Sequence, residues 1–153
     1  MKNLFFSMIF VLAACTNVMA DESAVGSTLP PNVRVLLIQE MIAVLDASKT
    51  ILDALVRGQD EVVAKNAQAI HDSFIMAQKM TEADKQALLK AVPEAFLKRD
   101  EAFHELSARL AEAARKGDKG LQRKLYYEAI DSCVACHANH ATDRFPELRQ
   151  AGR

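Results

Sequence analysis

The sequence has no tryptophan, five glycines, four prolines, three cysteines and few aromatic residues among its 153 positions. Residues with high helix propensity (Ala, Leu, Glu, Lys and Gln) are by contrast plentiful. This composition favours an all-α fold. Half of the residues are hydrophobic, so the chain is able to bury a core of one-domain size.

An excess of charge of one sign is also missing, since the formal net charge is −1. No block of basic residues with interleaved aromatics occurs, which argues against nucleic acid as a partner. No apolar run approaches the ~20 residues of a membrane-spanning helix. We therefore expect no transmembrane segment in the mature chain.

The N-terminus has the three parts of a secretory signal peptide. Lys2 supplies a positive charge, residues 4–14 form a short apolar run, and residues 18–20 (Val-Met-Ala) form a small-x-small cleavage site followed by acidic residues. Residues 1–20 are thus predicted to be a signal peptide that exports the chain to the periplasm.

Cys15 raises a second possibility, because residues 12–15 (Leu-Ala-Ala-Cys) also fit a lipobox that would make Cys15 a lipidated N-terminus. We favour cleavage after Ala20, since the region before that site is well formed and a lipoprotein signal would be short. The mature chain then keeps only Cys133 and Cys136, and no structural disulfide is expected.

Residues 133–137 read Cys-Val-Ala-Cys-His, the C-x-x-C-H pattern of covalent c-type haem attachment. In that chemistry each thiol forms a thioether with one vinyl group of the haem. The imidazole that follows binds the iron on one face. The pattern predicts one haem c held by Cys133 and Cys136, with His137 as its proximal ligand.

Two other interpretations of this motif compete with haem. A reactive dithiol normally has its first cysteine at a helix N-terminus, whereas this motif lies late in a predicted helix. A zinc site of Cys133, Cys136, His137 and His140 has suitable ligand types, but it lacks a second ligand pair at finger-like spacing. The export signal strengthens the haem interpretation. His140, which lies on the same helix as His137, cannot reach the opposite face of the iron and is then expected to be exposed.

Apolar residues recur at alternating steps of four and three along four predicted helices, at about 32–58, 60–80, 93–116 and 121–139, with a short helical piece at 81–91. Short turns connect these helices. The pattern predicts an antiparallel up-down-up-down four-helix bundle with the haem near the C-terminal end of the last helix. Residues 21–31 are expected to be a flexible leader, 32–143 the helical domain and 144–153 a C-terminal tail.

A C-x-x-C-H motif on the last helix of a four-helix chain behind a signal peptide resembles the class II cytochromes c, the cytochrome c-prime family. The resemblance covers residues 32–143 and implies thioether links at Cys133 and Cys136 and ligation by His137. It also implies that the start of the first helix forms the distal side of the haem. Some members of this family form homodimers through their first two helices, so the resemblance implies a homodimer.

Within that family, low-spin members supply a methionine to the iron, whereas cytochrome c-prime proper leaves the sixth position open. Met41 lies on the apolar seam of the first helix and is our candidate distal ligand; His71 is the reserve. Arg34, near the start of the same helix, is a candidate partner for a haem propionate. The family often has a basic residue four positions after the haem-binding histidine, where this chain has Ala141.

The sequence thus predicts a periplasmic cytochrome that transfers single electrons to and from redox partner proteins. No catalytic base–nucleophile set accompanies the motif, so we do not expect an enzyme. The alternative is an open distal site that binds nitric oxide or carbon monoxide.

Overall fold

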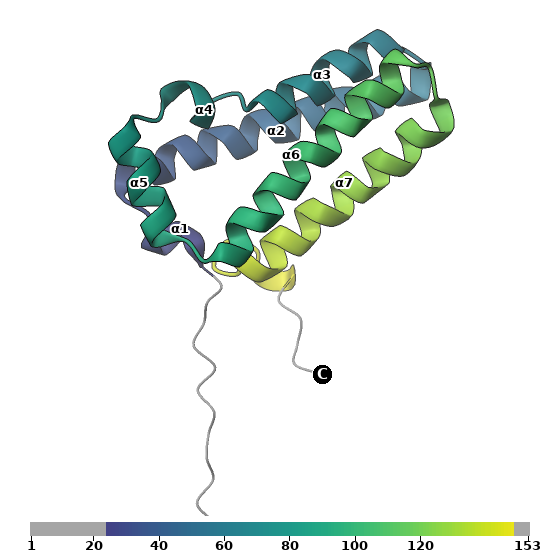
Figure 1. Cartoon of the computed structure of the whole chain (residues 1–153). Coiled ribbons are helices and arrows are strands. Elements are labelled where there is room, and N and C mark those ends of the chain that lie inside the picture. Colours follow the sequence, from purple (N-terminus) through teal and green to yellow (C-terminus); the bar gives the residue numbers. More distant parts are fainter. Residues whose placement is uncertain (1–23, 149–153) are drawn as a thin grey trace, which may run out of the picture.

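The computed structural model describes residues 24–148, which form seven α-helices and one short 3-10 helix (Figure 1). The helices are α1 (Val25–Thr28), α2 (Pro31–Arg57), α3 (Asp60–Asp72), α4 (Met76–Lys79), α5 (Glu82–Ala91), α6 (Glu94–Arg115) and α7 (Lys119–His140), and the 3-10 helix is η1 (Pro146–Leu148). The all-α class is therefore confirmed. Within the described part, extended pairing is limited to a bridge between Ala24 and Ala141.

Two tight turns reverse the chain at the same end of the molecule (Figure 1). Gly58, with φ 72°, ends α2 in the left-handed conformation, and its N–H group donates to Ala54 and Leu55. Gly117, with φ 69°, plays the same part between α6 and α7. Glycine is favoured at both places because positive φ is strained for residues with a Cβ.

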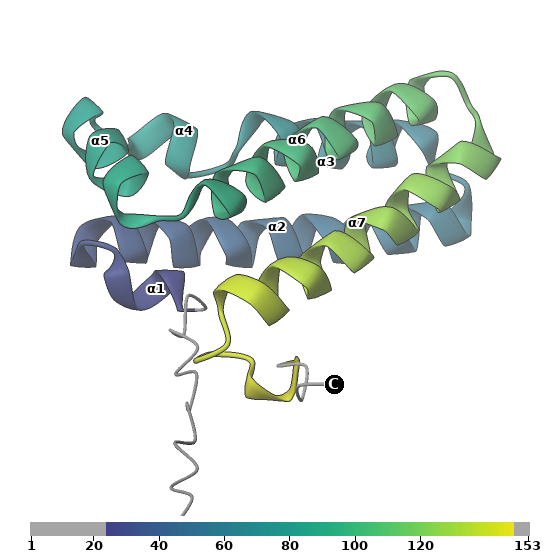
Figure 2. The same cartoon turned by 60° about the horizontal axis from the view of Figure 1, so that its bottom comes forward.

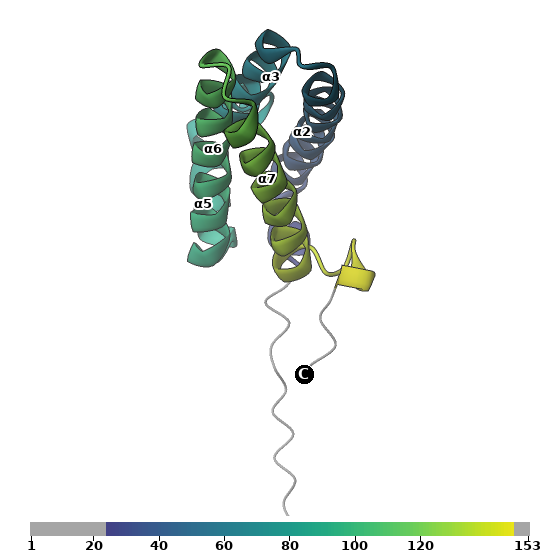
Figure 3. The same ribbon diagram turned by 90° about the vertical axis from the view of Figure 1, so that its right-hand side faces the viewer.

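The four longest helices pack in chain order, with α2 on α3, α3 on α6, and α6 on α7 (Figures 2 and 3). The α3–α6 contact is the most extensive, and α7 packs far more on α6 than on α2. One core cluster unites these helices through Val44, Ala47, Ile51, Ala54, Val63, Ala64, Ala67, Ile70, Leu106, Leu110, Ala111, Ala113, Ala114 and Leu125.

The helix predicted over 60–80 is interrupted, which corrects the expectation from periodicity. Helix α3 ends at Asp72, and Ser73 has a positive φ of 60°. The chain resumes as the single turn α4. The interruption is stabilised from outside the segment, because the carboxylate of Glu40 on α2 accepts hydrogen bonds from residues 73–76.

The prediction of a flexible leader is also corrected, for residues 24–31. Val25 and Leu29 are buried against Val33 and Val92, which makes α1 part of a second apolar cluster. The Thr28 hydroxyl also donates to the Ala91 carbonyl at 2.9 Å. Burial of apolar surface thus orders a segment whose own composition is that of a loop. The predicted signal peptide, Cys15 and residues 21–23 lie outside the described residues.

The short helix expected at 81–91 is present as α5. Its start is a capping box, in which Thr81 and Asp84 satisfy each other's backbone N–H groups. Pro93 precedes α6 as its N-cap residue. None of the helices in the described part of the chain is long and apolar enough to cross a membrane.

Candidate functional site

Cys133, Cys136 and His137 lie in the last two turns of α7 and are all half-buried. The helix is fixed at its start by Asp118, whose side chain accepts from the N–H group of Leu121 at 2.9 Å. Cys133 and His137 are four residues apart and so share one face of the helix. The local structure thus presents two thiols and an imidazole in the order that the motif requires.

The surroundings of both thiols raise their pKa values and so reduce the fraction present as reactive thiolate. Burial raises the pKa of Cys133. Burial also raises the pKa of Cys136, and the negative charge of Asp100 on α6 raises it further, against a smaller opposite effect of Arg99. A reactive dithiol requires a lowered thiol pKa. The interpretation as a thiol–disulfide oxidoreductase is therefore disfavoured.

His137 is placed as a neutral imidazole. Burial lowers its pKa below the ordinary value, which favours the uncharged ring that binds metals. The ring lies against Phe145, with centroids 4.2 Å apart and an angle of 12° between the planes. One side of the imidazole is thus covered by an aromatic residue of the segment that follows α7.

His140 packs against α6. It is buried, with 7% exposure, and meets the Phe96 ring edge-on at 5.6 Å. The expectation that His140 is exposed was wrong, because Phe96 of α6 lies against its ring. No group of three or more His, Cys, Asp or Glu side chains in residues 24–148 is arranged to hold a metal ion.

Met41 and the motif lie on the same side of a hydrogen bond that joins α2 to α7. The hydroxyl of Tyr126 donates to the carbonyl of Ser48 at 3.0 Å and ties the two helices together. Met41 lies seven residues before Ser48, and Cys133 lies seven residues after Tyr126. Seven residues make two helical turns on the same face. The two helices run in roughly opposite directions and are inclined to each other (Figure 1), so Met41 and Cys133 each lie two turns from this contact, on the side away from the two glycine turns.

Met41 is 38% exposed, in keeping with the slight packing of α7 on α2. Arg34, the candidate propionate partner, is engaged elsewhere in this structure. Its guanidinium donates to the carbonyls of Ser27 and Leu29, at 3.2 and 3.1 Å, and so holds α1 against the start of α2. A propionate contact of Arg34 stays a prediction.

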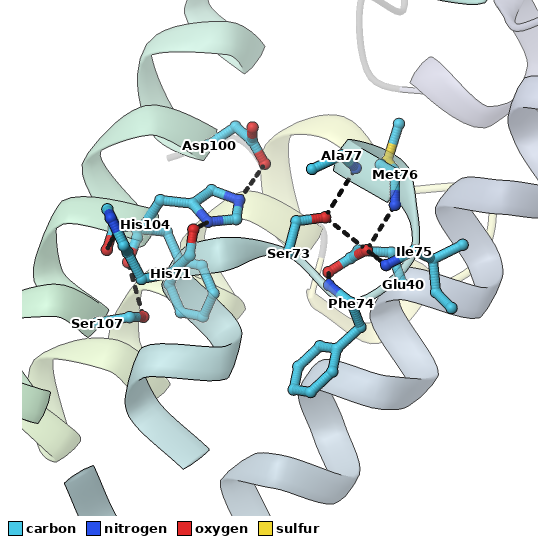
Figure 4. Close-up of polar contacts among 11 residues, drawn as sticks. Glu40, His71, Ser73, Phe74, Ile75, Met76, Ala77, Asp100, His104 and Ser107 are labelled. Atoms are coloured by element: carbon cyan, nitrogen blue, oxygen red, sulfur yellow. Dashed lines mark hydrogen bonds and ion pairs between the residues drawn. The ribbon is translucent and has the colours of Figure 1, made fainter. Parts of the chain in front are cut away.

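Two carboxylates near the site were missed by the sequence analysis. Glu40 is 3% exposed, and burial opposes its ionisation. Hydrogen bonds from three backbone N–H groups and the Ser73 hydroxyl outweigh that effect and hold its pKa below the ordinary value (Figure 4). The sequence did contain a sign that Glu40 is buried. Glu40 lies on the apolar seam of α2, four residues before the buried Val44 and seven after the buried Val33.

Asp100 is the second carboxylate, on α6. Withdrawal from water raises its pKa, although half of its side chain is exposed; the charge of His104 opposes the rise and that of Glu40 adds to it. Its oxygen Oδ1 is 3.8 Å from Nε2 of His104 (Figure 4). Asp100 is a negative charge close enough to Cys136 to affect that thiol.

His71, the reserve ligand, takes part in a contact between α3 and α6. Its Nδ1 atom is 3.0 Å from the carbonyl oxygen of His104, and Nδ1 of His104 is 2.9 Å from the carbonyl oxygen of His71 (Figure 4). Both rings thus stabilise the contact between two helices, which leaves Met41 as the better-placed candidate for the iron.

Comparison with known proteins adds no relative to this picture. The chain matches no family model, no curated protein and no solved structure. The motif in α7 and its surroundings are therefore the features that indicate a function.

Proposed function

We propose that this protein is a periplasmic c-type cytochrome that carries one haem c and transfers single electrons. Cys133 and Cys136 would hold the haem through thioether bonds, and His137 would bind its iron. When bound, the haem supplies a ferric/ferrous couple. The observation that carries the proposal is the C-x-x-C-H motif in the half-buried last turns of α7.

The chain's own contribution would be to exclude water and to orient the ligands. The partial burial of both thiols and of His137 supports a site that is shielded from part of the surrounding water. The stack of Phe145 on His137 would fix the rotation of the imidazole. Axial ligand identity and burial are the means by which a protein sets a haem potential.

We also propose how the four longest helices are arranged. The four longest helices, α2, α3, α6 and α7, would form an antiparallel bundle of the class II cytochrome type. Their order of packing and the two turns at one end support it. Export by residues 1–20 and exchange of electrons with periplasmic redox proteins complete the proposal.

The partial exposure of Met41 favours one second candidate function. If Met41 does not bind the iron, the sixth coordination position of the haem iron is open on the side that faces α2. The protein would then bind small gases such as nitric oxide or carbon monoxide.

Absorption spectroscopy of the mature protein tests both candidates. A pyridine haemochrome assay should give one covalent haem c per chain, and Cys133→Ser/Cys136→Ser should abolish it. Absence of covalent haem in the wild type would refute the proposal. A low-spin ferric spectrum with a methionine-to-iron band supports electron transfer, whereas a five-coordinate high-spin spectrum supports gas binding.

Met41→Ala identifies the distal ligand. We expect this variant to lose the methionine-to-iron band and to become high-spin. Met80→Ala, a half-buried methionine between α4 and α5, is the matched control and should keep the wild-type spectrum. An unchanged low-spin spectrum of Met41→Ala would assign the role to another residue, with His71→Ala the next variant to measure.

A further inference from the structure

The outward face of α7 carries exposed apolar side chains next to the haem-binding motif. They are Tyr127, Ile130 and Val134, which are 70%, 40% and 45% exposed. Steps of three and four residues place them on one side of the helix, opposite the fully buried Leu125. Helix α7 packs on α6 with its other side. Val134 lies between the two cysteines of the motif, so this apolar surface reaches the candidate site itself.

The segment that follows α7 extends the same surface. Phe145 is 39% exposed and stacks on His137, which lies one turn after Val134, and η1 packs against α7. We call Tyr127, Ile130, Val134 and Phe145 the α7 patch. Apolar surface that several neighbouring residues share and that the fold leaves open to solvent marks an interaction site.

Three exposed carboxylates surround the α7 patch. Asp131 lies within the stretch of α7 that carries the patch, and Asp143 and Glu147 lie on either side of its phenylalanine in the sequence. Within residues 24–148, none of the three takes part in an ion pair or a side-chain hydrogen bond. Arg144 is the one Lys or Arg between positions 125 and 148. The patch thus has an acidic rim whose charges are available to a partner.

The basic residues near the two glycine turns, at the other end of the molecule, are by contrast paired within the chain. Lys119 pairs with Asp60, and Arg115 and Lys116 pair with Glu112 at 3.7 and 3.1 Å. An anionic partner at that end would have to compete with these ion pairs. A cationic partner at the α7 patch would not.

We propose that the α7 patch docks an electron-carrier protein whose own surface has an apolar centre and a cationic rim. Charge complementarity argues for this partner, because its cations would meet Asp131, Asp143 and Glu147 and speed the encounter. The patch would supply the apolar centre of the interface. That the partner carries electrons rests on the proposed function, since Val134 lies within the motif and electron transfer requires a short distance to the haem. The docking face itself does not require the haem.

Paramagnetic line broadening in NMR spectra of the mature protein maps the docking face, with the ferrous state used where haem is bound. The probe is tris(phenanthroline)chromium(III), an inert, triply charged cation with aromatic ligands. Hexaamminechromium(III) carries the same charge without apolar surface, and hexacyanochromate(III) carries the opposite charge. Amide signals of the α7 patch and its acidic rim should broaden most with the phenanthroline complex, less with the ammine complex and least with the anion.

Charge reversal at the rim tests the role of the carboxylates. Asp131→Lys should weaken binding of the phenanthroline complex about tenfold at low salt, because a like charge then lies roughly 8 Å from a triply charged cation in screened water. Glu61→Lys is the matched control. Glu61 is exposed at the start of α3, beside the glycine turns, and its reversal changes the net charge equally. It should leave the dissociation constant within about twofold of the wild type.

Tyr127→Ser tests the apolar centre. It should weaken binding of the phenanthroline complex and leave binding of the ammine complex unchanged, since only the first has aromatic ligands. Equal loss for both complexes, or no loss for either, would contradict an apolar contribution. Far-UV circular dichroism must show wild-type helicity in each variant; where it does not, Asp143→Lys replaces Asp131→Lys and Val134→Ser replaces Tyr127→Ser.

Three results would overturn the docking face. One is broadening that spreads over the molecule or centres away from the patch. Another is an affinity of Asp131→Lys equal to that of the wild type. The third is a patch that takes the probe only after residues 149–153 are deleted, because the chain's own C-terminal segment, with Arg149 and Arg153, would then be its occupant.

Stopped-flow oxidation of the ferrous, haem-loaded protein by tris(phenanthroline)cobalt(III) tests whether electrons leave through this face. One electron passes from the ferrous haem to cobalt(III), which becomes cobalt(II). After correction for any change in potential, the rate at low salt should fall about tenfold in Asp131→Lys and stay unchanged in Glu61→Lys. Equal rates in the two variants would overturn the electron-carrier assignment. Absence of covalent haem would refute the proposed function alone, because the line-broadening map tests the docking face in either case.

Discussion

The imidazole of His137 lies parallel to the phenyl ring of Phe145, with ring centroids 4.2 Å apart. Phe145 is brought there by a turn after α7, in which the N–H groups of Arg144 and Phe145 both donate to the carbonyl of Ala141 at 3.0 Å. The segment after the helix thus folds back over the last turn of α7. The stack links the orientation of His137 to the order of the C-terminal segment.

We predict that Phe145→Ala lowers the free energy of unfolding by about 1 kcal/mol, the typical worth of an aromatic pair beyond its buried area. Urea denaturation measures this loss. In the haem-loaded protein the reduction potential should also change, because the imidazole is free to rotate.

Tyr127→Ala is the control for Phe145→Ala. Tyr127 lies on α7 at 70% exposure, away from the stack. Its loss should change neither the free energy of unfolding nor the reduction potential. Equal effects of the two variants would show that the stack on His137 contributes nothing specific.

Glu40 stabilises the interruption between α3 and α4. Its carboxylate accepts from the Ser73 hydroxyl at 2.9 Å and from the N–H groups of Phe74, Ile75 and Met76 at 2.9, 2.6 and 2.9 Å (Figure 4). We predict that Glu40→Gln costs about 3 kcal/mol of unfolding free energy, since a neutral amide accepts more weakly and adds unpaired donors.

The pH dependence of stability provides a second readout for Glu40. Its folded pKa is held below the ordinary value of 4.5, so ionised Glu40 stabilises the fold above that pH. This stabilisation is lost as the pH falls from 4.5 through the folded pKa. The unfolding free energy of Glu40→Gln should therefore fall less steeply over this range than that of the wild type. Glu105→Gln, at an exposed position of α6, should follow the wild-type curve.

Local signals in the sequence predicted much of the fold. Gly58 and Gly117 mark the ends of helices in both the sequence and the structure, and the Thr81–Asp84 box starts α5 where the pattern places it. These features depend only on neighbouring residues, as do the four-three apolar steps. The motif residues Cys133 and His137 were likewise recognisable from their spacing alone.

The errors arose where distant residues decide the structure. Phe74 and Ala77 continue the apolar rhythm of α3, yet the helix ends at Asp72 because Glu40, on α2, binds the backbone that follows. His140 was expected to be exposed, but Phe96 of α6 covers it. No sequence-local pattern reports such contacts, and the same holds for the charge of Asp100 beside Cys136.

Ser73 combines a strained backbone with two useful hydrogen bonds. Its φ is 60°, its hydroxyl donates to Glu40, and the same oxygen accepts from the N–H group of Ala77 at 3.1 Å. Glycine removes the strain and the hydroxyl together, whereas alanine removes only the hydroxyl. We predict that Ser73→Gly is more stable than Ser73→Ala by about 1 kcal/mol, with both below the wild type.

Thermal and urea unfolding of the two Ser73 variants measure this order. Ser107 on α6 provides the comparison: it is also buried, and its hydroxyl donates to the Phe103 carbonyl within a regular helix. Ser107→Gly should be less stable than Ser107→Ala, because glycine is unfavourable inside a helix. The same order at both positions would contradict the strain at Ser73.

His71 and His104 form a reciprocal pair across α3 and α6, each ring bonded to the other's backbone carbonyl at 3.0 and 2.9 Å. Because a carbonyl oxygen only accepts, Nδ1 carries the proton in both rings. Each ring bonds to backbone and not to the other ring. Removal of one side chain therefore leaves the second bond in place.

We predict that His71→Ala and His104→Ala each cost about 1 kcal/mol and that their effects add in the double variant. Chemical denaturation of all four proteins in the cycle measures this. A strong coupling energy would show instead that the end of α3 shifts when either ring is lost. His71→Ala should also keep the wild-type absorption spectrum of the haem-loaded protein. A change of spin state in this variant, with Met41 intact, would place His71 at the iron.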